Sequence, residues 1–570
     1  MRALAQALMP HLTIVPILLP LLTACLLLLL DGRRHRIRGM IGLAAALANL
    51  AVAVLLLFWV GSDQPAAYGV YLPSNWDVPF GIVLVADRLS VLLLVTAAVV
   101  ALMALLFAVA RWHKAGAHFH PLFQIQIMGL NGAFLTGDLF NLFVFFEVML
   151  AASYGLLLHG SGPSRVRTGL HYVAINLLAS SLFLIGAALI YGVTGTLNMA
   201  DIAARIPQVA TGDRALLHAG FAVLGVAFLA KAAMWPLNFW LVPAYAAASA
   251  PAAAVFALLT KVGVYVLLRF STLMFSDQAG ASAGFGSDWL LWGGTATLAA
   301  GAFGMFSTQR PGRLAGFAVI VSSGTLLAVL GLARPELTAG ALYYLPSSTL
   351  GVAAFFLLAE LMERSRSADV AGARAPEDEE DHLPFPLAEL ELDKDVNLDE
   401  DEEMLIGHAI PAATALLGLA FICCTLLVAG LPPLSGFIGK FVLLSALVPG
   451  LGVDTASTDA LLTWVLPILI VLSGLCALVA LSRVGIRFFW TPVDREAPLL
   501  RVVEFVPIAV LVGVCVFISV RAEPVMRYAA ATADALYRPA GYIDAVLSAR
   551  PRPTPTNAER LGLQGPESAP

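Results

Sequence analysis

The chain has 570 residues, of which 59% are apolar and only 12% are charged, and its mean hydropathy is +0.85. Soluble globular proteins usually carry about 45–50% apolar and about 25% charged residues, so this composition excludes them. Apolar runs recur from residue 12 to residue 520, and the gaps between them are too short to hold soluble domains. We therefore expect a single all-α polytopic membrane domain.

The formal net charge of −5 hides two regions of opposite sign. Residues 377–403 hold 14 acidic residues and one lysine, whereas the rest of the chain has 32 basic and 24 acidic residues, a balance of +8. A segment this acidic cannot pack in a core. We expect an acidic insert over residues 367–404 that extends into solvent.

No sequence motif calls for a metal or a cofactor. The five cysteines lie in apolar runs without CxxC or zinc-ligand spacing, so neither a disulfide framework nor a metal or iron–sulfur site is indicated. The chain also lacks a P-loop and a GxGxxG motif that opens a helix. We expect no cofactor and no enzymatic activity.

Counting stretches of about 20 apolar residues, the length that crosses about 30 Å of hydrocarbon, predicts about fourteen transmembrane helices. The first run is too long, and too weakly flanked by basic residues, for a cleavable signal peptide. Beyond the last span we expect an interfacial amphipathic helix over 523–548 and a disordered tail over 549–570. The predicted spans are 11–30, 39–60, 89–110, 121–137, 139–158, 170–192, 215–237, 243–272, 288–306, 313–333, 337–362, 405–447, 460–482 and 501–520.

Arginine-rich loops predict the orientation, because short cytoplasmic loops are enriched in Lys and Arg. When the spans alternate, six such loops fall on one side of the membrane. This side is expected to be cytoplasmic, which puts both termini and the tail on the outer side and the acidic insert on the cytoplasmic side. The six loops are 33–38, 111–114, 164–167, 308–313, 363–366 and 482–487.

Helix-breaking residues interrupt apolar sequence in two regions. Proline removes an amide donor and clashes with the preceding turn, and carbonyls freed at membrane depth need protein or water as partners. Breaks at corresponding positions of two halves are typical of transporters built from inverted repeats, although simple kinked helices remain an alternative. The residues are Pro236, Pro243 and Pro251 in the first region and Pro432, Pro433 and Gly436 in the second.

The chain has 28 arginines but only five lysines, and three of these, Lys231, Lys261 and Lys440, lie inside apolar spans. Arginine stays charged, whereas a desolvated lysine can release and recover a proton. Glu147 is the only acidic residue deep in a span, and we expect Lys231 to be its partner. The alternative is that these groups form structural ion pairs that hold the bundle together.

Other polar residues are weaker candidates for a proton path. Asp138 is nine residues, or about 13.5 Å of helix rise, from Glu147 and is expected to be an interfacial or capping group rather than a member of a proton relay. His159, His171 and His408 lie at span ends and are likewise expected to be interfacial or capping groups rather than proton carriers. His218 lies inside its span and is either a hydrogen-bonding core residue or a proton carrier.

Three segments resemble a known family, the D subunit of the multisubunit Mrp (Pha) monovalent cation/proton antiporters, which is related to the antiporter-like subunits of respiratory complex I. The resemblance covers about residues 80–520. The three segments read TGDLFNLFVFFEVMLAASY, AKAAMWPLNFWLVPAYAAASAPAAAVFALLTKVGVYVLLR and AGLPPLSGFIGKF, from residues 136, 230 and 429.

This resemblance implies fourteen helices with two inverted five-helix repeats and discontinuous helices. The chain then divides into N-terminal helices (1–120), a first repeat (121–272), a second repeat (288–482) that carries the insert, and a last span (501–520). It also implies a relay of Glu147, Lys231, Lys261 and Lys440 that moves protons along the membrane midplane.

The sequence departs from the wider superfamily in its second half. Ser347 stands where relatives often have His, and Val352 stands where complex I types often have Lys. Water or the hydroxyls of Ser347, Ser348 and Thr349 would then have to bridge this part of the path.

The resemblance predicts a subunit that exchanges cytoplasmic Na⁺ or K⁺ for external protons in a bacterial inner membrane, together with its sister subunits. Two alternatives stay open. The chain could be a proton-pumping subunit of a complex I-type oxidoreductase, or a non-conducting assembly scaffold whose buried charges are structural.

Overall fold

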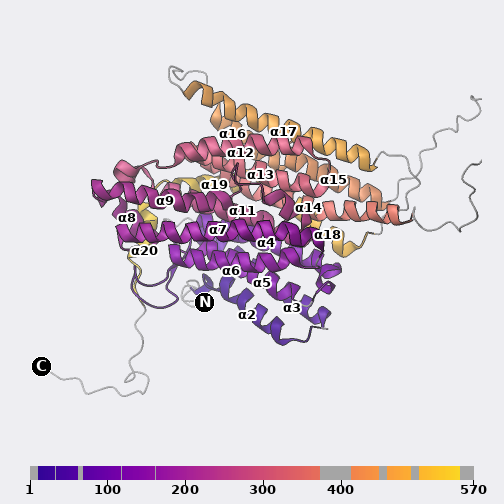
Figure 1. The fold of residues 1–570 in the computed structure, drawn as a ribbon, viewed down its shortest axis with the longest axis horizontal. Helices are drawn as coiled ribbons and strands as arrows, with labels where there is room; N and C mark the ends of the chain where they lie inside the picture. Colours follow the sequence, from indigo (N-terminus) through magenta and orange to yellow (C-terminus); the bar gives the residue numbers. More distant parts are fainter. Residues whose placement is uncertain are drawn as a thin grey trace, which may run out of the picture.

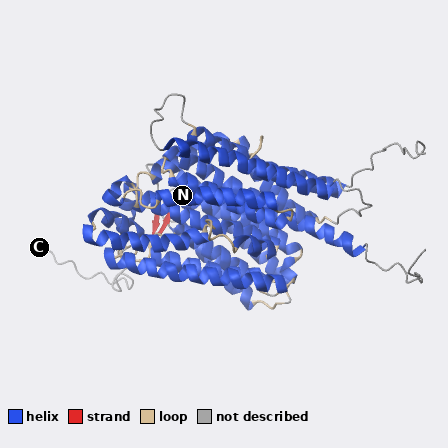
Figure 2. Ribbon diagram, turned by 45° about the horizontal axis from the view of Figure 1, so that its top comes forward, coloured by secondary structure: helices blue, strands red, loops and turns tan. Residues whose placement is uncertain are grey.

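The computed structural model describes residues 11–32, 34–61, 68–116, 118–160, 162–372, 412–448, 459–489 and 500–551. Within these ranges the chain is a bundle of long helices whose axes run roughly side by side (Figure 1), and the two short strands are the only strands (Figure 2). The strands β1 (Gly69–Tyr71) and β2 (Leu84–Ala86) pair antiparallel, with Gly69 opposite Ala86.

The helices, in chain order, are α2 (Val15–Leu29), α3 (His35–Gly61), α4 (Arg88–Ala110), α5 (Phe119–Leu135), α6 (Leu139–Leu158), α7 (Pro163–Thr194), α8 (Met199–Arg205), α9 (Thr211–Lys231), α10 (Leu241–Ala247), α11 (Ala250–Arg269), α12 (Ser287–Ser307), α13 (Pro311–Gly331), α14 (Pro335–Gly372), α15 (Ala412–Ala429), α16 (Ser435–Leu447), α17 (Asp459–Phe489), α18 (Val502–Val520), α19 (Ala522–Leu536) and α20 (Ala540–Leu547). Short helical turns add η1 (Trp112–Lys114), η2 (Ile206–Gln208), η3 (Phe270–Met274) and η4 (Asp277–Ser282).

The prediction of an all-α polytopic membrane protein is confirmed. In the described part of the chain, eleven helices are long and apolar enough to cross a membrane, and α2 and α16 are apolar but shorter. Each of the fourteen predicted spans falls on one or two helices. The apolar stretch of α11 is completely buried and those of α13 and α14 are almost completely buried, whereas α3 and α18 bury only a third of theirs. The three helices therefore form the core of the bundle, and the outer helices leave apolar faces for lipid.

The predicted arginine-rich loops gather at one end of the bundle. Trp112 Nε1 donates a hydrogen bond to Glu360 at 2.8 Å, and Arg501 donates to the carbonyl of Ala110 at 3.2 Å. Arg364 forms an ion pair with Glu504 at 2.7 Å. We call this the arginine-rich end, and it lies on the right in Figure 1.

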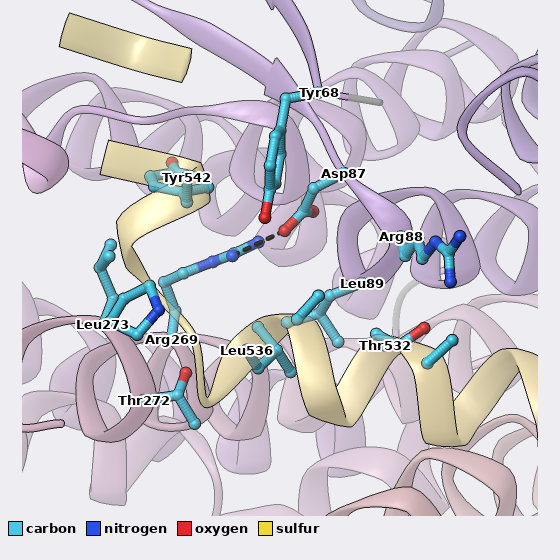
Figure 3. A pocket seen from close by; sticks show the side chains of 13 residues that line it. Tyr68, Asp87, Arg88, Leu89, Arg269, Thr272, Leu273, Thr532, Leu536 and Tyr542 are labelled. Carbon is cyan, nitrogen blue, oxygen red and sulfur yellow. Dashed lines mark ion pairs between the residues drawn. The ribbon is translucent and has the colours of Figure 1, made fainter. Parts of the chain in front are cut away.

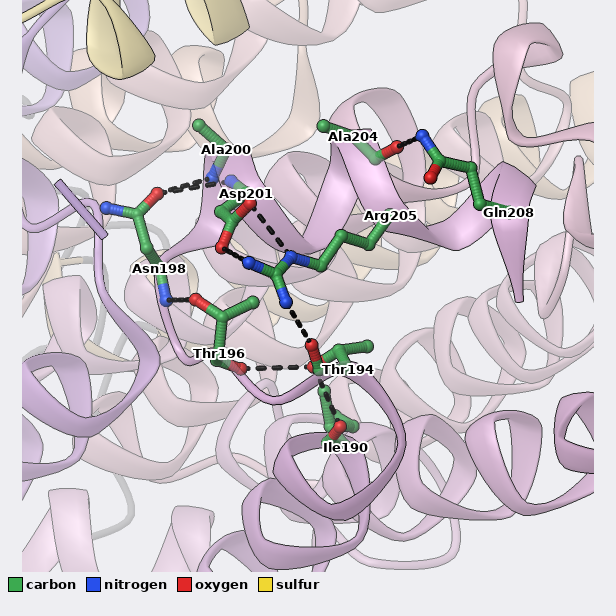
Figure 4. Close-up of polar contacts among 9 residues, drawn as sticks. All are labelled: Ile190, Thr194, Thr196, Asn198, Ala200, Asp201, Ala204, Arg205 and Gln208. Atoms are coloured by element: carbon green, nitrogen blue, oxygen red, sulfur yellow. Dashed lines mark hydrogen bonds and ion pairs between the residues drawn. The ribbon is translucent and has the colours of Figure 1, made fainter. Parts of the chain in front are cut away.

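The opposite end is organised by a polar turn between α7 and α8 (Figure 4). Asn198 caps α8 by accepting hydrogen bonds from the amides of Ala200 and Asp201. Arg205 donates to the Asp201 carboxylate at 3.0 Å and to the carbonyl of Thr194 at 2.8 Å. Because a side chain satisfies the free amides at the start of α8, this short helix can begin directly after the transmembrane helix α7.

Both predicted helix interruptions are present. Residues 232–240 separate α9 from α10, with Ala233 in the left-handed region (φ 58°). The amide of Trp235 in this break donates to Thr297 Oγ1 of α12 at 2.8 Å, so protein replaces the lost helical partner. The second break separates α15 from α16 and begins at Gly430 (φ 74°).

Not every predicted helix breaker lies in a break. Pro236 belongs to the first break, and Pro432 and Pro433 belong to the second. In contrast, Pro243 and Pro251 stand in the first turns of α10 and α11, where proline loses no helical hydrogen bond. Gly436 is the second residue of α16, and its missing side chain allows close approach to the backbone of Leu427 in α15.

Some expectations fall on parts of the chain that the structure does not describe. The acidic insert lies outside the described residues from 373 onward, as does His408, and the tail does so from residue 552. The range expected to form one interfacial helix forms two helices, α19 and α20, and α19 packs mainly against α14.

Candidate functional site

Lys231 is the last residue of α9 and is 7% exposed. Its Nζ donates a hydrogen bond to Asn176 Oδ1 of α7 at 2.7 Å and lies 5.3 Å from the centre of the Phe146 ring. The helix break places the side chain at the negative end of the α9 dipole, which favours a cation. The interruption therefore exposes a cation-stabilising helix end inside the bundle.

Glu147 of α6 lies across from Lys231, and the two side chains line one cavity of about 10 Å³, which is room for about one water molecule. No ion pair within 4.0 Å joins these two described residues. Instead, the Glu147 carboxylate accepts a hydrogen bond from Ser180. Ser180 is one turn from Asn176 on α7 and donates to its carbonyl at 2.9 Å. The expected ion pair is thus replaced here by a bridge of two neutral residues.

Lys261 lies at the centre of the protein, on the fully buried helix α11, and is 1% exposed. Its Nζ donates to Ser322 Oγ of α13 at 2.7 Å, and Ser323 Oγ is farther away at 3.5 Å. Ser322 in turn donates to Ser348 Oγ of α14 at 2.9 Å. Three central helices are therefore joined through one lysine and two hydroxyls.

Lys440 repeats the arrangement of Lys231 at the second break. Its Nζ donates to the carbonyl of Ala429, the last residue of α15, at 2.9 Å. That carbonyl has no partner within its own helix, so a cation again sits at the negative end of a half-helix. Gly430 and Gly474 make room for the lysine, because a side chain at Gly430 would meet its aliphatic stem.

Hydroxyl groups extend the polar path between Lys261 and Lys440. Ser347 Oγ donates to Ser435 Oγ, at the start of α16, at 2.7 Å. Both predicted serines therefore take part: Ser348 contacts Ser322, the partner of Lys261, and Ser347 contacts the first residue of α16, the helix that carries Lys440. Thr349 donates to the carbonyl of Leu345 in its own helix at 2.7 Å and contributes no link in this structure.

The other candidates lie apart from the lysines. Asp138 caps α6 by accepting from the amide of Asn141 at 2.9 Å, and burial raises its pKa. His218 hydrogen-bonds Ser282 Oγ at 2.9 Å and stacks on Phe285. It is thirteen residues, or about 19.5 Å of helix rise, from Lys231.

Sequence reasoning missed the groups that hold the lysines. Asn176, Ser180 and Ser322 are neutral, and only their polarity within apolar spans could have drawn attention to them. It also missed a buried ion pair between Asp87, which caps α4, and Arg269, at the end of α11, with an N–O distance of 2.7 Å. The available signal was an arginine at the end of a span, remote from the arginine-rich loops.

Comparison with known proteins gives one family-model match and close full-length relatives. The family model described as NADH:quinone oxidoreductase/Mrp antiporter, TM, matches residues 136–374. The chain is 52% identical to the D subunit of a probable K(+)/H(+) antiporter of Rhizobium meliloti, over 95% of this chain and 98% of that protein. It is 32% identical to the D subunit of an Na(+)/H(+) antiporter of Alkalihalophilus pseudofirmus, over 95% and 100%.

Solved structures share the fold. A chain of the Mrp complex from Dietzia sp. has a TM-score of 0.76 at 25% identity, covering 95% of this chain and all of that one. A chain of respiratory complex I from Thermus thermophilus has a TM-score of 0.70 at 21% identity, covering 94% and 100%, and at this identity it shows the fold alone. On the strength of the full-length relatives, the chain belongs to the D-subunit family of monovalent cation/proton antiporters.

Proposed function

We propose that the chain is the proton-translocating subunit of a multisubunit antiporter that exchanges cytoplasmic Na⁺ or K⁺ for external protons, with the other Mrp-type subunits as partners. The full-length similarity to the D subunits of K⁺/H⁺ and Na⁺/H⁺ antiporters supports this function. The chain then acts as a transporter subunit in a bacterial inner membrane. Its arginine-rich end faces the cytoplasm, and both termini are on the outer side.

One observation carries the proposal. Lys231, Lys261 and Lys440 donate to an amide oxygen, a hydroxyl and a backbone carbonyl, and no carboxylate lies within 4.0 Å of any of them in the described part of the chain. A permanent cation buried without a counter-ion costs several kcal/mol. A lysine avoids this cost by releasing its proton, so this arrangement suits a group that changes its charge.

The relay then works by moving charge between neighbouring sites. When Glu147 and Lys231 separate, as they are here, Asn176 holds the lysine and Ser180 holds the glutamate. When they pair, Lys231 stays protonated. Protons pass on to Lys261, then along the Ser322, Ser348 and Ser347 hydroxyls and water towards Lys440. A cation bound nearby disfavours protonation, and by reciprocity protonation weakens cation binding.

The experiment measures proton flux out of everted vesicles with a fluorescent pH probe. The whole operon is expressed, the vesicle interior is acidified with ATP instead of a respiratory substrate, and Na⁺ or K⁺ is then added. The proposal predicts cation-dependent dequenching that disappears when this chain is deleted. If flux requires NADH or another reductant, the complex I-type alternative replaces the antiporter.

A non-conducting scaffold is the remaining alternative, and it predicts that charge-preserving substitutions of the buried lysines leave flux unchanged. The relay predicts the opposite, because arginine retains the positive charge but cannot release a proton.

A further inference from the structure

A cavity of about 170 Å³ lies beside α20, at the end of the bundle remote from the arginine-rich end (Figure 1), and Figure 3 shows the side chains that line it. Its walls come from the start of α4, the end of α11 and the C-terminal helices α19 and α20. We call it the Asp87 cavity, after the carboxylate in its wall. The residues that matter for its chemistry are Tyr68, Asp87, Arg269, Thr272, Thr532 and Tyr542.

The cavity contains a buried ion pair that none of the relay residues uses. Arg269 Nη1 lies 2.7 Å from Asp87 Oδ2, and the two side chains are 5% and 6% exposed. The other carboxylate oxygen accepts from the amide of Ser90 at 2.9 Å. Tyr542 packs on the guanidinium at 5.1 Å, and the Tyr68 hydroxyl points towards the pair (Figure 3).

The ion pair lies in line with the central lysine of the relay. Lys261, Tyr265 and Arg269 are spaced by four residues and share one face of α11. Arg269 Nη2 approaches the Tyr265 hydroxyl at 3.5 Å, and that hydroxyl donates to the carbonyl of Phe134 at 2.8 Å. Between Tyr265 and Lys261 about 6 Å of helix rise remains.

We propose that the Asp87 cavity is the port through which protons pass between this end of the bundle and Lys261, with the Asp87–Arg269 ion pair as its gate. This inference rests on the proposed function and adds an entrance to it. A buried ion pair adds little net stability, and ionisable groups inside a membrane protein usually mark ion pathways.

The chemistry of the pair suits a gate. Burial alone would raise the pKa of Asp87, but the adjacent Arg269 guanidinium and its hydrogen bond hold the pKa below its usual value. Asp87 therefore accepts a proton from cavity water only when Arg269 turns away. The carboxyl then returns the proton to water as the pair closes, and the neutral Lys261 amine takes it up as ammonium. The fixed charge of Arg269 repels Na⁺ and K⁺ from the same path.

The first test neutralises the pair without leaving an isolated charge. The Asp87→Asn/Arg269→Gln double variant is compared with Glu504→Gln/Arg364→Gln, which neutralises an ion pair with the same 2.7 Å separation at the opposite end. The port predicts that only the first variant loses cation-dependent flux, by about tenfold or more, in a complex that assembles normally on a native gel. Equal flux in the two variants would overturn it.

The second test does not depend on the stability of that variant. Ala535→Cys in the cavity wall is labelled with a charged, membrane-impermeant thiol reagent in intact cells, before everted vesicles are prepared, in a chain whose five native cysteines are replaced. Ala530→Cys, on the same helix but outside the cavity, is the control. Labelling should block flux at Ala535→Cys alone, and unchanged flux after labelling there contradicts the port.

Lys261→Arg in the same vesicles separates the two proposals. If it abolishes flux while the Asp87 double variant and the labelled cavity leave flux intact, only the port is wrong. If Lys261→Arg also leaves flux intact, the relay itself fails.

Discussion

At the scale of single residues, the three lysines of the relay have different partners from Arg269 and Arg364, although the buried Arg38 also donates to backbone carbonyls. Each buried lysine donates to a neutral oxygen, whereas Arg269 and Arg364 each contact a carboxylate at 2.7 Å. The difference follows from their chemistry, because only lysine can lose its charge when it is desolvated. A neutral partner leaves both protonation states of the lysine available.

If Lys231 must change its charge, Asn176→Asp should slow transport. The new carboxylate would stand where Asn176 Oδ1 now lies, 2.7 Å from Lys231 Nζ, and would hold the lysine as ammonium. We expect cation-dependent flux to fall by about tenfold while the amount of assembled complex on a native gel is unchanged. Unaltered flux would show that Lys231 need not change its charge.

The adjacent serines of α13 provide a matched pair of substitutions. Ser322→Ala removes the 2.7 Å partner of Lys261 and the link to Ser348, whereas Ser323→Ala removes only a 3.5 Å contact. Loss of a buried partner costs about 1–3 kcal/mol, so flux in vesicles with Ser322→Ala should fall about tenfold. Ser323→Ala should stay close to wild type, and equal effects of the two would contradict the hydroxyl path.

At the scale of elements, the two helix breaks have the same role, because each places a buried lysine at the C-terminal end of a helix. Lys231 ends α9, and Lys440 reaches the last carbonyl of α15, so each break offers a buried lysine the negative end of a helix dipole. The breaks could be predicted from Pro236, Pro432 and Pro433. Which carbonyl or amide would hold each lysine could not, because these contacts join different helices.

The second break predicts a specific effect of Gly430→Ala. Gly430 has φ 74°, and an added Cβ would come within 2.5 Å of the Lys440 side chain. The left-handed conformation alone costs about 1–2 kcal/mol for a non-glycine residue, so the purified complex should melt at a lower temperature and lose flux. Gly418→Ala in the neighbouring helix, where the new atom makes ordinary contact at 3.7 Å, should leave the melting temperature unchanged.

At the scale of the whole molecule, hydropathy and charge were enough to predict the helical bundle. Each predicted span corresponds to one or two helices, because membrane thickness fixes a helix length that the sequence records directly. The arginine-rich loops meet at one end because successive spans alternate in direction, and short cytoplasmic loops are the ones enriched in arginine. Pairing across the bundle is different, since Asp87 and Arg269 are far apart in the sequence and meet only where α4 packs against α11.

Two single cysteines test the proposed orientation. Ser164→Cys lies at the arginine-rich end and Ser548→Cys lies just after α20, and both positions are exposed. In intact cells a membrane-impermeant maleimide should label Ser548→Cys and not Ser164→Cys. Everted vesicles should give the reverse pattern, and labelling of Ser164→Cys in intact cells would invert the proposed topology.

The most direct test of the central claim, that the buried lysines carry the protons, is the flux of the complete complex with Lys231→Arg. Lys114→Arg is the control, because it makes the same substitution at an exposed lysine. We predict that cation-dependent dequenching disappears with Lys231→Arg and persists with Lys114→Arg, while both complexes assemble normally. Persistent dequenching with Lys231→Arg would mean that this lysine is structural, and the relay would be wrong.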